Sequence, residues 1–497
     1  MIGRIGRIVV AILLTSSSAA AEPWSAQQDH ADMMRQLGIT RLRPGPSGDP
    51  SAPNTANYDP ALANPFPVWP ELLRMADGRP VTTATMWRHE RRPELVELFE
   101  REIYGRIPVG VPGVAWRVDT VDREYFGGRA VIAQQLVGHV AGETEAKPTI
   151  DIRATLILPA KTVGRVPLLV MFAPARFPAP SQPDPSEAER LNAAIRAMLV
   201  ARDPALGTVF ARHPGFEVVK PGGFVAPPPD DDRITQLVAD GWGVALLDTA
   251  SIQADDGAEL RRGIIGLVNN GGPRTPDQWG ALRAWGWGAS RLLDYLATRP
   301  EVDATKVGIE GVSRWGKAAL VTAAFDERFA MVLIGSSWEG GVKPHRRRFG
   351  EQVENLTGPG SYHWMAGNFL KYGTEQGRLG RKTAGDLPVD AHELLALVAP
   401  RLAFVSYGVP AQGDANWLDQ QGSYMATIAA GRAWTLLGGT DLGRGNAYRS
   451  AVLPPVGTDL LAGSLAWRQH DGGHTDAPNM RYFLRWADSK ISHQPGR

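Results

Sequence analysis

Five short stretches of the chain are apolar almost without interruption. They are 166–175 (VPLLVMFAPA), 242–250 (WGVALLDTA), 306–312 (KVGIEGV), 329–337 (FAMVLIGSS) and 401–408 (RLAFVSYG). Such runs are typical of strands that are buried on both faces of a sheet. Helix-like segments lie between some of them, at 278–300 and 314–329. Strands that alternate with helices predict a three-layer α-β-α sandwich around a mostly parallel sheet.

Three earlier stretches, 114–126, 129–141 and 150–159, instead alternate apolar and polar residues. This alternation is typical of antiparallel strands with one face in water. Together with the later strands they predict one mixed sheet.

Three further parts are expected outside this pattern: a helix, an N-terminal arm and an insertion. Residues 93–105 have helical periodicity and end at Gly105, and residues 22 to about 80 are polar and rich in proline, as in an extended arm. We therefore divide the chain into an arm with its helix at 22–105 and an α/β domain at 106–497. A proline-rich insertion at about 173–232 is either surface decoration or a rim that contacts substrate.

The N-terminus has the pattern of a secretory signal. Arg4 and Arg7 precede the apolar run 8–14, and small residues follow up to Ala21. We predict a signal peptide at 1–21 that is cleaved, so that the protein is secreted, to the bacterial periplasm. The run is too short to span a bilayer, so no membrane attachment is expected after cleavage.

Composition narrows the possible partners. The 497 residues carry a net charge of +1, which provides no electrostatic basis for binding nucleic acid or an anionic membrane. There is no cysteine, so no disulfide can form. Spacings such as H-E-x-x-H are missing, and we expect a monomer without metal or cofactor.

The stretch KVGIEGVSRWGKAAL (306–320) predicts a strand, a sharp turn at Ser313 and a helix. In a nucleophile elbow, G-x-S-x-G, such a turn lifts the serine hydroxyl out of the sheet. Here the second glycine comes one place late, at Gly316. The position of this motif within an α/β pattern nevertheless favours Ser313 as a nucleophile over a structural serine.

A nucleophilic serine needs a histidine base and an acid that orients it. In the stretch LAWRQHDGGHTDAP, two histidines follow a predicted strand near the C-terminus, where this fold class places the base. We favour His474, since two glycines precede it, over His470. For the acid, Glu339 follows one apolar strand, and Asp414 and Asp419 follow the next, so the sequence leaves the choice open.

Two cations stand in the first turn of the helix after Ser313. Arg314 and Lys317 oppose the helix dipole there by about 0.3–1 kcal/mol each. Ester hydrolysis would bring negative charge to this place, as an oxyanion and as a carboxylate product. Pairing with surface acids is the alternative explanation for these cations.

With these residues and several further stretches, the sequence resembles the glucuronoyl esterases, carbohydrate esterase family 15. The stretches are GVSRWGK, WEGG, RRRFGEQVENLTGPGSYHWMAGNF, LPVDAHELLALVAPR, NWLD and RQHDGGHT. The resemblance covers about residues 85–490. It implies an α/β-hydrolase fold for the domain at 106–497 and the activity of a carboxylic ester hydrolase of the 4-O-methyl-glucuronoyl methylesterase type. Its substrate would be the ester between 4-O-methyl-glucuronic acid of glucuronoxylan and lignin alcohols in lignocellulose.

The resemblance also implies catalytic roles. Ser313 matches the nucleophile, His474 the base and Glu339 the acid, while Asp414 matches a second acid of some bacterial members. Arg314 would support the oxyanion hole.

Substrate-binding roles follow in the same way. Lys317, Glu354 and Trp417 would hold the hydroxyls and ring of the glucuronate, and Glu351 is the nearby alternative to Glu354. Val312 replaces the usual cysteine of the motif.

Two other functions compete with this interpretation. An acetyl-xylan or general carboxylesterase could use the same scaffold. A non-catalytic carbohydrate-binding protein could use the 15 tryptophans. The retention of serine, histidine and acids in this order weighs against the second alternative.

Overall fold

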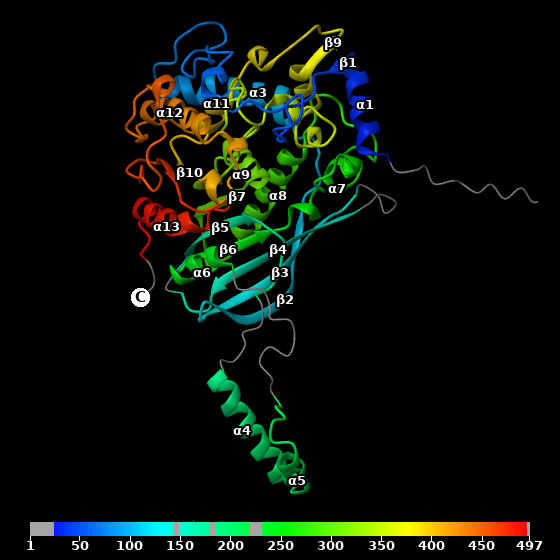
Figure 1. The fold of residues 1–497 in the computed structure, drawn as a ribbon, viewed down its shortest axis with the longest axis vertical. Coiled ribbons are helices and arrows are strands. Elements are labelled where there is room, and N and C mark those ends of the chain that lie inside the picture. The colour runs from blue at the N-terminus through cyan, green and yellow to red at the C-terminus, as the bar shows by residue number, and fades with distance from the viewer. Residues whose placement is uncertain (1–23, 143–148, 163, 179–184, 219–230, 495–497) are drawn as a thin grey trace, which may run out of the picture.

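The structure is a computed structural model that describes residues 24–142, 149–162, 164–178, 185–218 and 231–494. The predicted signal peptide lies outside the described residues and stays a prediction. The described residues form one large sheet with helices on both faces (Figure 1).

The large sheet has nine strands in the order β11-β10-β8-β7-β5-β6-β4-β3-β2. They are β2 Ala115–Phe126, β3 Arg129–Val140, β4 Ile150–Pro159, β5 Val166–Phe172, β6 Gly243–Leu247, β7 Val302–Val312, β8 Met331–Gly335, β10 Leu402–Tyr407 and β11 Leu465–Gln469. β2, β3, β4 and β6 pair antiparallel, and all other pairs are parallel. The predicted mixed, mostly parallel sheet is confirmed.

Burial explains why some strands are apolar throughout while others alternate apolar and polar residues. Every residue of β5, β6, β8, β10 and β11 is buried, whereas most residues of the edge strand β2 are exposed. A strand covered on both faces favours apolar side chains, whereas β2 is covered so little that polar side chains are tolerated along it.

Helices cover the two faces of the sheet unequally. The larger apolar core contains α8 Ala281–Leu296, α9 Arg314–Phe325, α11 Ala391–Ala396 and α12 Gln420–Leu436. On the opposite face, α6 Asp232–Ala239 and α13 Ala477–Ile491 form a second core with the strands. The other helices are α1 Ala26–Leu37, α2 Ala84–Met86, α3 Arg92–Phe99, α4 Pro185–Arg202, α5 Ala205–Arg212, α7 Gly263–Val268 and α10 Val353–Leu356. The predicted α/β-hydrolase sandwich is thereby confirmed.

The N-terminal arm is less extended than the sequence suggests, because it begins with helix α1. Ser25 and Gln28 form a capping box at its start, and Gly38 ends it with a φ of 68°. Met33 and Leu37 of the helix are buried in the larger core. After α1, the short strand β1 Ile39–Leu42 pairs with β9 Thr374–Gly377, which fixes the arm to the body.

The predicted insertion contains two helices, α4 and α5, which contact each other and lie apart from the layers in Figure 1. Parts of the insertion fall outside the described residues. Across the residues that are described, no helix combines the length and the apolar character needed to cross a membrane.

Candidate active site

Ser313 occupies the turn between β7 and α9. Its φ of 68° and ψ of −134° are unfavourable for a residue with a side chain. The turn is held by two backbone bonds, from Ser313 N to the Gly335 carbonyl at 2.9 Å and from Lys317 N to the Ser313 carbonyl at 3.1 Å. This strained strand-turn-helix geometry is that of a nucleophile elbow.

The late glycine of the motif has a packing function. A Cβ atom on Gly316 would lie 2.5 Å from the Gly335 carbonyl of β8, and one on Gly311 would lie 2.3 Å from the Trp315 carbonyl. Both distances are closer than real Cβ atoms allow. Gly311 and Gly316 therefore permit α9 to lie directly against β7 and β8.

His474 lies in the loop after β11, and its imidazole Nδ1 is hydrogen-bonded to Asp414 Oδ1 at 2.8 Å. Asp414 follows β10 and is fully buried, while 37% of the His474 side chain is exposed. The other oxygen of Asp414 accepts hydrogen bonds from Gly408 N at 2.6 Å and from Ser336 Oγ at 2.9 Å. Because β7, β10 and β11 are parallel, their carboxyl ends place these residues at the same sheet edge as Ser313.

His470, the other candidate base, is bound within its own loop. Its Nε2 contacts the Thr475 carbonyl at 2.7 Å, and Gly472 N donates to its Nδ1 at 3.0 Å. Both ring nitrogens are thus occupied, which leaves no site for a serine proton.

Glu339 belongs to a different, fully buried charge cluster. Its carboxylate accepts a hydrogen bond from Lys343 Nζ at 2.6 Å and contacts His345 Nδ1 at 2.5 Å. Burial by itself would raise the pKa of Glu339, but Lys343 and His345 outweigh it and lower that pKa. Among the described residues, its hydrogen-bond partners do not include His474, so the structure does not bring these two predicted residues together.

Arg314 points its guanidinium at Asp255, with Nη1 2.5 Å from Oδ2. The other oxygen of Asp255 accepts hydrogen bonds from His363 Nε2 at 2.9 Å and from Trp364 Nε1 at 2.6 Å. Burial would raise the pKa of Asp255, yet these three donors hold it well below its usual range. About half of the Arg314 side chain remains exposed, so its charge is fixed in place beside Ser313 and still accessible.

Lys317 is fully buried, and its ammonium lies 3.4 Å from Glu351 Oε2. Trp338 and Trp364 cover it, with ring centroids 4.3 and 4.8 Å from Nζ. Burial lowers the pKa of Lys317 to about 8, although Glu351 opposes the shift. The Lys317 side chain thus has no exposed surface, and its ammonium is paired with Glu351.

The remaining predicted binding residues are Trp417, Glu351 and Glu354, and the two glutamates bind different partners. Glu351 N donates to the Trp417 carbonyl at 3.1 Å, which links Trp417 to the carboxylate beside Lys317. Glu354 instead accepts from Arg43 Nε of the arm at 2.9 Å and lies 3.5 Å from Arg348. The geometry therefore places Glu351, the alternative, next to Lys317, and directs Glu354 toward the arm.

Sequence reasoning missed four residues around this site: Asp255, Ser336, Trp338 and Trp364. Ser336 stands in the apolar run 329–337 and Trp338 begins the stretch WEGG, and both have positive φ, at 41° and 30°. Asp255 is one of two adjacent acids in a loop, and no spacing in the sequence separates it from Asp256.

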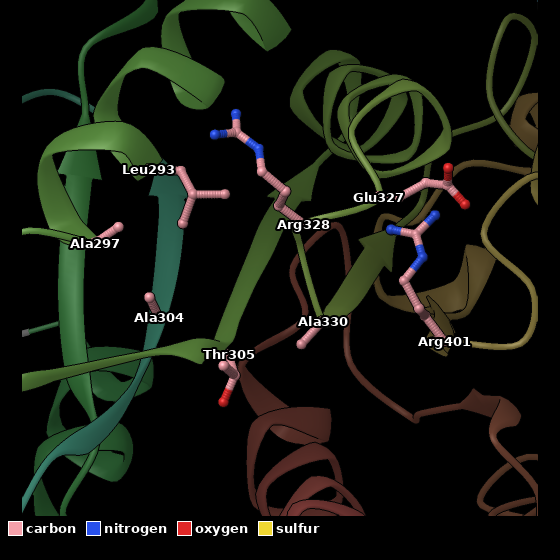
Figure 2. Close-up of a pocket in the computed structure, with 8 residues that line it drawn as sticks. All are labelled: Leu293, Ala297, Ala304, Thr305, Glu327, Arg328, Ala330 and Arg401. Atoms are coloured by element: carbon pink, nitrogen blue, oxygen red, sulfur yellow. The ribbon is translucent and has the colours of Figure 1, made fainter.

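A hollow of about 550 Å³ lies at the opposite edge of the sheet, near Thr305 and Ala330 (Figure 2). Its two arginines are occupied: Arg401 donates to four backbone carbonyls, and Arg328 binds Asp294. No feature of this hollow indicates a reaction site. Within the described part of the chain, no group of three or more potential ligands could hold a metal ion.

The sheet order, the strained serine turn and the adjacent histidine–carboxylate pair define a protein of the α/β-hydrolase class. A family model described as "Glucuronyl esterase, fungi" matches residues 274–438. The structure is similar to that of a CE15 glucuronoyl esterase from Teredinibacter turnerae T7901, with a TM-score of 0.76 and 40% identity, covering 94% of this chain and 100% of that one. The chain therefore belongs to carbohydrate esterase family 15, the glucuronoyl esterases.

Two curated relatives extend this comparison. Carbohydrate esterase MZ0003, from an unknown prokaryotic organism, is 29% identical over 444 residues, which cover 88% of this chain and 93% of the relative. The 4-O-methyl-glucuronoyl methylesterase of Hypocrea jecorina is 33% identical over 170 residues, about a third of either chain. Similarity to the fungal enzyme is thus concentrated in one part of the catalytic domain.

Proposed function

We propose that this protein is a serine esterase that hydrolyses esters between 4-O-methyl-glucuronic acid of glucuronoxylan and lignin alcohols. The main support for the proposal is the His474–Asp414 hydrogen bond, which lies at the same sheet edge as the strained Ser313 turn. Membership in the glucuronoyl esterase family supports the uronic acid as the acyl group.

In the proposed reaction, His474 takes the proton of the Ser313 hydroxyl as the oxygen attacks the uronoyl carbonyl. Arg314 and backbone N–H groups stabilise the oxyanion of the tetrahedral intermediate. His474 then gives its proton to the leaving alcohol, and an acyl-enzyme remains. Water, deprotonated by His474, attacks the acyl-enzyme and releases the glucuronate and Ser313.

We assign the acid of this triad to Asp414 and not to Glu339. Asp414 accepts a hydrogen bond from His474 Nδ1–H, and Ser336 and Gly408 hold its second oxygen. This arrangement keeps Nε2 of the imidazole free to accept the serine proton. Glu339, which is bound by Lys343 and His345, stabilises the loop after β8.

For the sugar, we propose that Glu351 and Trp417 contact the hydroxyls and ring of the glucuronate. The buried ammonium of Lys317 orients Glu351 and opposes the effect of burial, which raises the pKa of Glu351. Because Trp417 and Glu351 are joined through the backbone, the two side chains form one binding wall.

The test compares wild type with Ser313→Ala on benzyl glucuronate. Release of benzyl alcohol should fall by about 10³-fold or more, because the attacking oxygen is lost. Ser489→Ala, an exposed serine on α13, serves as the matched control and should keep full activity. Retained turnover in Ser313→Ala would reject the proposal. Faster hydrolysis of xylan acetates than of methyl glucuronate would instead indicate an acetyl-xylan or general carboxylesterase.

We also propose export to the periplasm after cleavage at Ala21 and action as a monomer. The support is the signal-like pattern of residues 1–21. N-terminal sequencing of the periplasmic protein should begin at Glu22, and sedimentation equilibrium should give the mass of one chain. An uncleaved cytoplasmic product would contradict the first statement, and a dimer mass the second.

A further inference from the structure

The N-terminal arm lines one side of an open cavity that the proposed mechanism does not use. The cavity has a volume of about 340 Å³ and is lined by residues of the arm between 43 and 62 and of the segment 348–354. We propose that this arm cavity is a binding subsite for neutral pentose units of the polysaccharide that carries the glucuronate. The inference rests on the proposed function, because it extends the substrate beyond the uronic acid.

The segment 348–354 connects the arm cavity to the residues proposed to bind glucuronate. Within the segment 348–354, Glu351 contacts Lys317, while its neighbour Gln352 lines the arm cavity. Trp417 contacts both parts: its carbonyl accepts from Glu351 N at 3.1 Å, and a Cβ atom on Gly48 of the arm would lie 3.8 Å from its ring. In this proposal, a sugar chain bound at Glu351 continues past Trp417 into the arm cavity.

The wall formed by the arm is preorganised. Asn57 Nδ2 donates to the Arg348 carbonyl at 2.8 Å, and Gly350 N donates to the Asn57 carbonyl at 3.0 Å. Asn355 Nδ2 adds a bond to the Pro46 carbonyl at 2.9 Å. Because these bonds fix the arm before any ligand arrives, binding in the cavity loses little conformational entropy.

The two arginines of the cavity differ in what they can offer a ligand. Arg43 is only 10% exposed and is committed to Glu354 and to the Thr374 and Tyr372 carbonyls. The Arg348 side chain is 39% exposed and lies 3.5 Å from the same Glu354. Arg348 therefore has N–H groups available for ligand oxygens, and Glu354 offsets much of the local positive charge.

The rest of the lining fits a neutral sugar. Pro44, Pro46 and Leu62 contribute apolar side chains to the lining, and Asn54 and Thr55 contribute polar ones, with Asn54 Nδ2 donating to the Gly45 carbonyl at 2.8 Å. A pyranose ring has apolar C–H faces and a rim of hydroxyl groups, which matches this combination of side chains. Ligand sites are typically mostly apolar with a few placed polar groups and have volumes of about 300–1,000 Å³. The arm cavity lies at the small end of that range, so we expect it to hold a short piece of chain.

The experiment compares two substrates in three variants. The substrates are benzyl glucuronate and the same benzyl ester on a glucuronate-bearing xylooligosaccharide. Arg348→Met and Asn54→Ala remove polar groups from the arm cavity, and Arg41→Met is the matched control, since Arg41 pairs with Glu375 outside it. For the oligosaccharide ester, Arg348→Met should lower kcat/KM about tenfold through KM, and Asn54→Ala should lower it by less. For benzyl glucuronate all variants should stay within about twofold of wild type.

Two outcomes would overturn the subsite. One is a wild-type enzyme that hydrolyses both esters with the same KM, and the other is an equal loss on both substrates in Arg348→Met. Failure of the wild type on every glucuronate ester would instead count against the proposed function. The subsite is then tested separately by calorimetric titration of Ser313→Ala with neutral xylotetraose. Binding that Arg348→Met weakens supports the subsite, whereas no binding, or binding of uronate-bearing chains alone, rejects it.

Discussion

The imidazole of His474 and the carboxylate of Asp414 are joined by a 2.8 Å hydrogen bond between Nδ1 and Oδ1. The carboxylate is fully buried at the end of β10, and the imidazole is partly exposed in the loop after β11. Since β10 and β11 are adjacent parallel strands, their consecutive loops meet at one edge of the sheet. The pair therefore depends on the sheet order and not on closeness in the sequence.

Asp414→Asn and Glu339→Gln should separate catalysis from stability. We expect Asp414→Asn to lower kcat by about 10³–10⁴-fold, because the amide would no longer hold the imidazole in the reactive tautomer. Glu339→Gln should leave the kcat of the folded enzyme nearly unchanged and lower the free energy of unfolding by about 3 kcal/mol, since it leaves a buried cation unpaired. Steady-state kinetics and urea unfolding of both variants check this. The reverse pattern would assign the acid to Glu339.

The sequence predicted the sheet well because burial on both faces forces continuous apolar runs. The runs at 166–175 and 329–337, for example, contain the fully buried strands β5 and β8. Helix α1 was missed, although Ser25 and Gln28 form a capping box, because the surrounding arm is rich in proline and polar residues. Its apolar residues Met33 and Leu37 are buried in the larger core, and the sequence alone does not show this contact.

Site residues were harder to rank when several acids stood close together. Glu351 and Glu354 are three residues apart, and only the packing of the arm shows that Arg43 occupies Glu354. Glu339 and Asp414 both lie between the serine and the histidine in the sequence, so the order of these residues does not identify the acid. That choice depends on which loop bends toward His474, which is a tertiary property.

The lowered pKa of Lys317 predicts a pH dependence of KM. Burial brings this pKa to about 8, with Glu351 and Glu339 raising it and Arg314 lowering it further. As the pH rises through 8, the ammonium loses its charge and Glu351 loses its partner. We therefore expect KM for uronate esters to rise above pH 8, while KM for an aryl acetate stays constant.

Lys317→Met provides the control for this pH effect. Without an ionisable group at this position, KM for uronate esters should be raised about tenfold near pH 7 and should show no further step at pH 8. KM measured from pH 6 to 9 on both substrates checks the prediction. A step at pH 8 that persists in Lys317→Met would assign the titration to another group.

Glu310, three residues before Ser313 on β7, predicts a pH dependence of stability. Burial and the neighbouring Asp476 raise its pKa well above the usual value, although Arg233 contacts it at 3.2 Å. The folded protein thus keeps a proton that the unfolded chain releases, so this contribution to the free energy of unfolding is lost as the pH rises above about 4.5. The slope can reach about 1.4 kcal/mol per pH unit.

Glu310→Gln cannot titrate and should flatten this part of the stability curve. Urea unfolding between pH 5 and 8 measures the slope, and Glu327→Gln, which removes an exposed carboxylate, is the matched control. We expect the control to keep the wild-type slope. Identical slopes in wild type and Glu310→Gln would show that Glu310 is ionised in the folded protein.

Asp255→Asn tests whether Asp255 positions Arg314. Asp255 binds the guanidinium on one oxygen and holds His363 and Trp364 on the other, so its loss should let Arg314 move without removing it. We expect kcat to fall about tenfold with KM unchanged, less than the about 10²–10³-fold loss on removal of an oxyanion donor. Asp256→Asn is the neighbouring control. Once Arg314→Ala is present, Asp255→Asn should have no further effect on kcat, and full additivity of the two losses would contradict a positioning role.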